Sequence, residues 1–116
     1  MEERRKFPRL KFVVGVDYKI VKENHFTSTA TQSKDIAAGG VCIVVLDKLE
    51  VGSSLSLKFS LPDSAKPISA IGRIAWLEEF SVGSSHNSKA YDAGVEFIDI
   101  EDEDKQKISQ FVILRS

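Results

Sequence analysis

The sequence holds little of the chemistry from which disulfide frameworks and metal centres are built. Cys42 is the single cysteine, so no intrachain disulfide can form, and 116 residues can bury a core without one. There are two histidines and no Cys-x-x-Cys pair, which excludes the common zinc patterns. No run approaches the ~18 apolar residues of a membrane-spanning helix, and the N-terminus lacks the apolar stretch of a signal peptide. We therefore expect a cytoplasmic protein without membrane insertion.

Charge is almost balanced in total but unevenly distributed. The net charge is −1, whereas residues 2–11 hold five basic and two acidic side chains and residues 99–104 hold five carboxylates. A protein built for a nucleic acid polymer would carry basic and aromatic side chains across a strand face. A small basic patch suits a small anion better. We expect no nucleic acid polymer as a partner.

Period-two alternation of apolar and polar residues dominates the middle of the chain. This pattern is typical of half-buried antiparallel strands. It predicts six strands, separated by breakers rich in glycine, serine and proline, at 12–20, 25–37, 40–46, 54–62, 67–80 and 89–99. Six short strands at this spacing predict an all-β fold, a six-stranded antiparallel barrel. Gly72 is expected to mark a bend or bulge.

Only the C-terminus has a helical pattern. Acidic residues crowd its first turn, where the helix dipole favours negative charge. Ile108, Phe111 and Val112 form an apolar stripe, to which Ile113 could belong. We expect a C-terminal α-helix that covers one side of the barrel.

The N-terminal stretch EERRKFPRLKF concentrates the basic residues. Arg5 and Arg9 are four apart, but Pro8 lacks an N–H and disfavours helix at Phe7. We predict a flexible basic arm over residues 1–11 and a barrel domain over residues 12–116. Guanidinium planes stack on bases and bind phosphate with two donors, although a basic tail is often only solvated.

A second feature is KDIAAGGV at residues 34–41. Asp35 follows a strand, and Gly39-Gly40 turns the chain into a buried one. A carboxylate can accept two hydrogen bonds from the edge of a guanine, and glycines let a ligand approach the backbone. An ordinary hairpin turn with a capping aspartate explains the same residues.

Three other side chains have simpler interpretations. The alternation of strand 67–80 predicts that Trp76 packs in the core, and a stacking role is the less favoured alternative. Cys42 is expected to be an inert buried thiol. Arg73 either faces solvent or extends a binding patch. No base, nucleophile or metal constellation appears, so we do not expect an enzyme.

Four motifs in order resemble the PilZ domain, the bacterial receptor module for cyclic di-GMP. They are Arg-x-x-x-Arg at Arg5 and Arg9, DIAAGG at 35–40, GRIAW at 72–76 and GVEF at 94–97, and the likeness covers essentially the whole chain. The resemblance implies a six-stranded barrel with a closing helix that binds cyclic di-GMP on its outside.

The resemblance also implies roles for individual residues. Arg5 and Arg9 would stack on guanine and hold phosphate, Asp35 would read a guanine edge, and Gly40 would permit close approach. Arg4 would offer one more guanidinium plane for a stacked ligand pair. No cofactor is implied other than the ligand, and the output would pass to a downstream effector protein.

One position departs from the family pattern. The family's serine is Ala37 here, so a hydroxyl donor to the ligand is lost. Such a bond nets ~0.5–3 kcal/mol, so the affinity is expected to fall roughly tenfold to a hundredfold rather than vanish. The alternative is a degenerate PilZ-like protein–protein interaction module that no longer binds nucleotide.

Overall fold

The structure is a computed structural model that describes residues 8–21, 28–62, 64–83 and 88–115. Arg4 and Arg5 lie outside the described residues. Within the described ranges the chain forms seven strands and one helix. These are β1 (Leu10–Lys11), β2 (Gly15–Ile20), β3 (Thr29–Ala37), β4 (Gly40–Val45), β5 (Ser54–Phe59), β6 (Ile68–Ser81), β7 (Lys89–Ile100) and α1 (Asp102–Arg115).

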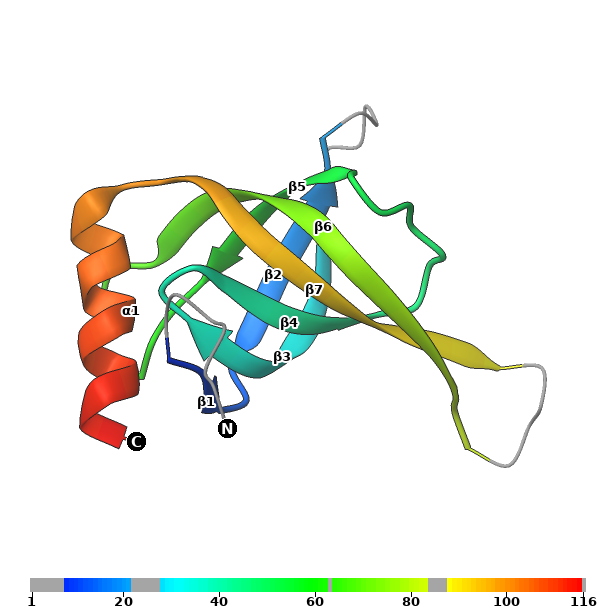
Figure 1. The fold of residues 1–116 in the computed structure, drawn as a ribbon, viewed down its shortest axis with the longest axis horizontal. Coiled ribbons are helices and arrows are strands. Elements are labelled where there is room, and N and C mark those ends of the chain that lie inside the picture. The colour runs from blue at the N-terminus through cyan, green and yellow to red at the C-terminus, as the bar shows by residue number, and fades with distance from the viewer. Residues whose placement is uncertain (1–7, 22–27, 63, 84–87, 116) are drawn as a thin grey trace.

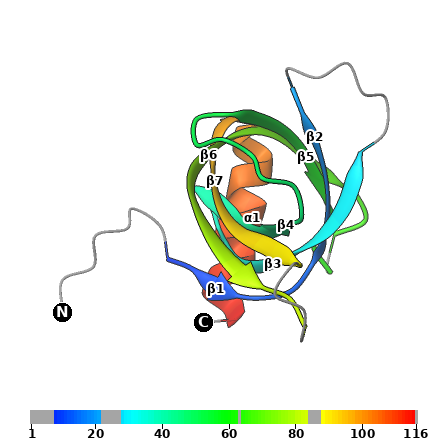
Figure 2. The ribbon, with the colours of Figure 1, turned by 90° about the vertical axis from the view of Figure 1, so that its right-hand side faces the viewer.

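Six of the strands close into an antiparallel barrel, as the alternation predicts. Their order is β3-β2-β5-β6-β7-β4, and the pairing of β4 with β3 closes the ring. Figure 2 looks into this ring, and α1 lies behind it across one end. The short β1 pairs with β3 beyond the end of β2 (Figure 1).

The interior of the barrel is filled by the alternating apolar side chains. Leu55, Leu57 and Phe59 of β5 are buried, while Ser54, Ser56 and Lys58 point to the other face. Figure 1 shows α1 at the barrel end, where Ile108, Phe111 and Val112 join the core. Ile113 is 60% exposed and does not belong to the stripe.

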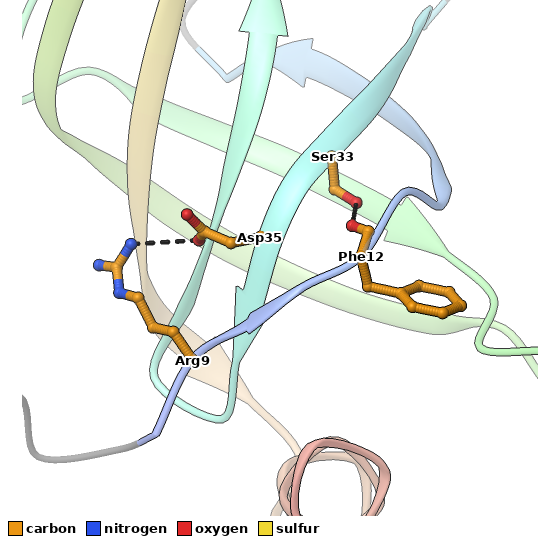
Figure 3. Close-up of polar contacts among 4 residues, drawn as sticks. All are labelled: Arg9, Phe12, Ser33 and Asp35. Carbon is orange, nitrogen blue, oxygen red and sulfur yellow. Dashed lines mark hydrogen bonds and ion pairs between the residues drawn. The ribbon is translucent and has the colours of Figure 1, made fainter. Parts of the chain in front are cut away.

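The regular pairing breaks between β1 and β2, where the backbone keeps two hydrogen bonds to β3 and the side chain of Ser33 adds two more. The Ser33 hydroxyl donates a hydrogen bond to the Phe12 carbonyl at 2.7 Å and accepts one from the Val14 N–H at 2.9 Å. Figure 3 shows the Ser33–Phe12 bond beside β1. β2 therefore begins at Gly15, later than the expected strand at 12–20, and the buried Ser33 ties the link after β1 to β3. The two residues of β1, Leu10 and Lys11, fall within the range predicted as an arm.

Two register shifts in the β6–β7 pairing decide which side chains face the core. One lies between Ile71 and Gly72, which confirms the expected irregularity at Gly72. The other lies between Ile74 and Trp76. A bulge adds one residue to a strand, so the alternation beyond it is reversed. Leu77 packs against the core in place of Trp76, which is 37% exposed. The prediction that Trp76 is a core residue is therefore wrong.

Among the described residues, no helix has the length and apolar character needed to cross a membrane.

Candidate ligand-binding cleft

Arg9 and Asp35 are in contact, although 26 positions separate them in the sequence. The pairing of Leu10 with Ile36 and of Lys11 with Asp35 brings the residue before β1 beside the end of β3. Arg9 Nη1 lies 3.1 Å from Asp35 Oδ1 and donates a hydrogen bond to it (Figure 3). Both side chains remain partly exposed. A pair of this kind adds only about 0.2–1 kcal/mol to stability, so its main consequence is geometric.

The turn between β3 and β4 is pressed against β7. The Phe97 N–H donates to the Gly39 carbonyl at 2.9 Å. A Cβ at Gly40 would lie 2.2 Å from the carbonyl oxygen of Val95, a distance that no side chain tolerates. Gly40 is therefore required by the close approach of two backbones. This contact places the turn at the edge of a cleft.

The cleft has a volume of about 430 Å³ and lies on the outside of the barrel. Its walls come from the segment before β1, the β3–β4 turn, β6, β7 and α1. Its lining includes Arg9, Ala37, Gly40, Trp76, Glu96 and Lys105. The structure thus gathers three of the predicted site residues in one cleft, and Asp35 adjoins it through Arg9.

Trp76 forms a wall of the cleft, where the sequence analysis favoured the core and ranked a stacking role second. An added Cβ at Gly94 would lie 2.1 Å from Trp76 Nε1, so the indole ring rests directly on the glycine of the neighbouring strand. The register places Asp35, Cys42, Gly94 and Trp76 in one row across β3, β4, β7 and β6. The available signal was a glycine in β7 that leaves room for an aromatic ring opposite it.

The charges at the cleft are mixed. Glu96 Oε1 accepts a hydrogen bond from Arg73 Nη2 at 3.2 Å, and both side chains are more than half exposed. Arg73 itself is exposed and is not among the lining residues of the cleft, although its partner Glu96 is. Arg9 and Lys105 line the cleft as cations.

Cys42 is the β4 member of this row and is 3% exposed, which confirms its predicted burial. Burial, and secondarily the negative charges of Asp35 and Asp92, raise the pKa of the Cys42 thiol to about 11. The thiol is therefore neutral near pH 7, and a neutral thiol is a poor nucleophile.

Comparisons with known proteins agree with the fold. A profile of the PilZ domain family, described as "PilZ domain", matches residues 3–114. A comparison with curated proteins finds no match.

Several solved structures share the architecture. The PilZ domain of YcgR from Escherichia coli with c-di-GMP is 10% identical, with a TM-score of 0.72 over 97% of this chain and 91% of that chain. The Bacillus subtilis inhibitor of motility MotI/DgrA is 24% identical, with a TM-score of 0.77 over 98% of this chain and 52% of that one. The K. pneumonia MrkH–c-di-GMP complex is 14% identical, with a TM-score of 0.74 over 98% and 52%. The chain spans about half the length of MotI and MrkH.

Proposed function

The chain belongs to the PilZ domain family, and on that premise we propose that its cleft binds cyclic di-GMP. The observation that carries the proposal is the convergence of Arg9, Ala37, Gly40 and Trp76 on one cleft. The volume of about 430 Å³ lies within the range of about 300–1,000 Å³ typical of small-molecule sites.

The cleft offers a surface for each part of the ligand. The indole of Trp76 is a flat face on which a guanine can stack, and base–aromatic stacking is worth about 1–3 kcal/mol. A guanidinium has five N–H donors, and the contact of Arg9 with Asp35 uses one of them. Arg9 therefore has donors to offer a phosphate or a guanine edge while Asp35 holds its orientation. Gly40 keeps the turn packed against β7 and so fixes the wall that the ligand would meet.

Ala37 sets the expected strength of binding. Its side chain is 6% exposed at the edge of the cleft and adds neither charge nor bulk there. The methyl group leaves the shape of the turn unchanged and removes only a hydroxyl donor. Binding is therefore weaker than with the family's serine but is retained.

The remainder of the proposed function concerns signalling. Arg4 and Arg5 precede Arg9 in the sequence, and bound ligand would order this arm against the barrel. The changed surface would be read by a partner protein, so the chain acts as a receptor or adaptor in the cytoplasm and not as an enzyme.

Isothermal titration calorimetry with cyclic di-GMP tests the proposal and reports the stoichiometry. We expect saturable binding by the wild type and loss of most of it in Arg9→Ala. Lys11→Ala is the matched control, because Lys11 is an exposed cation of β1 that does not line the cleft. No heat from folded wild-type protein would contradict the proposal and favour a PilZ-like interaction module, the reading that Ala37 also allows.

A further inference from the structure

Lys105 carries a positive charge into the cleft from the opposite end of the sequence. It lies in the first turn of α1, near Ile100 at the end of β7, and both residues line the cleft. Ile108 and Val112 follow it by three and seven positions and are fully buried in the barrel end. Residues at this spacing share a helix face, so the buried stripe turns Lys105 toward the barrel rim. The sequence pointed to cations on the arm, and to Arg73 as an open alternative, but not to Lys105.

The charge of the ligand calls for more than one cation. Cyclic di-GMP has two phosphates, and the cleft that would hold it also contains the carboxylate of Glu96, which is paired with Arg73. Arg9 and Lys105 enter the cleft from different elements. We propose that Lys105 contacts a phosphate of the bound ligand, so that the ligand is held by both the arm segment and α1. This inference rests on the proposed function.

A contact away from the cleft joins α1 to the link between β1 and β2. The ring of Phe12, three residues after Arg9, packs edge-on against Phe111 of α1 with the ring centroids 5.0 Å apart. Ligand bound by both Arg9 and Lys105 would add a second connection between α1 and the N-terminal part of the chain, beside the Phe12–Phe111 contact. We expect the amide protons of α1 to exchange more slowly when ligand is bound.

The test compares two lysines of one helix by calorimetry with cyclic di-GMP. Lys105→Met should weaken binding roughly three- to thirtyfold. This range corresponds to the loss of an interaction whose strength lies between that of an exposed ion pair and that of a charge-assisted hydrogen bond. Its affinity should also depend less steeply on salt, and Lys105→Arg should restore most of the binding. Lys107→Met is the matched control, because Lys107 lies on the same helix but lines a different hollow.

The outcomes separate the inference from the function on which it rests. Wild-type affinity in folded Lys105→Met, or an equal loss in Lys107→Met, would overturn the role of Lys105 and leave cyclic di-GMP binding intact. Absence of binding by the wild type would overturn both. At equal saturation with ligand, protection of the α1 amides that is as large in Lys105→Met as in the wild type would also contradict the phosphate contact.

Discussion

Replacing Gly94 with alanine tests the wall of the cleft without touching any charged group. The new Cβ would lie 2.1 Å from Trp76 Nε1 and 2.2 Å from Cε2, so the indole must move. Gly94 has no positive φ, and alanine therefore adds no backbone strain. The variant displaces the stacking surface and leaves Arg9 and the turn unchanged.

The expected effect follows from the loss of one stacking contact. Base–aromatic stacking of about 1–3 kcal/mol corresponds to binding that is roughly 5- to 150-fold weaker. The variant should lower the free energy of unfolding by only roughly 1–2 kcal/mol, because Trp76 is 37% exposed and can move toward solvent. An alanine at Gly72 would not serve this test, because its Cβ would lie 2.4 Å from the side chain of Val95, which is buried in the core.

The assay is a double-mutant cycle in ligand affinity. Gly94→Ala and Trp76→Ala should each weaken cyclic di-GMP binding, and the double variant should be little worse than Trp76→Ala alone, because both changes remove one contact. Gly15→Ala is the control, since nothing lies within 4 Å of its added Cβ. Wild-type affinity in folded Gly94→Ala, or simple additivity of the two losses, would refute the reasoning.

Three further predictions concern residues around the cleft. Ala37→Ser should restore a hydroxyl donor and raise the ligand affinity roughly tenfold in calorimetry; unchanged affinity would mean that this position does not face the ligand. Ser33→Ala removes both hydrogen bonds at the break before β2 and should lower the free energy of unfolding by about 1–3 kcal/mol in urea titrations, whereas exposed Ser60→Ala should change little. The pKa of Cys42 is raised from 9.0 to about 11, so the unfolded chain loses this proton first. Its contribution to stability is complete below about pH 9 and is lost as the pH rises to about 11. In Cys42→Ala this loss of stability between about pH 9 and about pH 11 should be absent. Identical pH dependence of the free energy of unfolding in the two proteins would contradict the prediction.

The architecture was predictable because the barrel depends on the alternation of apolar and polar residues, which can be read from the sequence. Leu55, Leu57 and Phe59 follow period two without interruption, and the structure buries all three. The terminal helix was predictable for a similar reason, since Ile108, Phe111 and Val112 form one helical face.

Trp76 shows where this reasoning fails. Period two places it with Ile74, but a bulge between the two residues reverses the alternation, and local sequence does not reveal which residue is the extra one. Ser33 illustrates the same limit. A serine within a weakly patterned strand gives no sign that its hydroxyl joins two backbone groups of another segment.

The cleft was only partly predictable. The resemblance named Arg9, Asp35, Ala37 and Gly40, and the structure supplies the strand pairing that brings them together. Lys105 was missed because its place at the cleft depends on how α1 crosses the barrel end, which is a property of tertiary packing.

The most direct test of the account is the fluorescence of Trp76 during a titration with cyclic di-GMP, because Trp76 is the only tryptophan in the sequence. Stacking of a guanine on the indole should change the emission saturably, with the dissociation constant that calorimetry gives. Calorimetric binding without any change in emission would place the ligand elsewhere and contradict the assignment of the cleft.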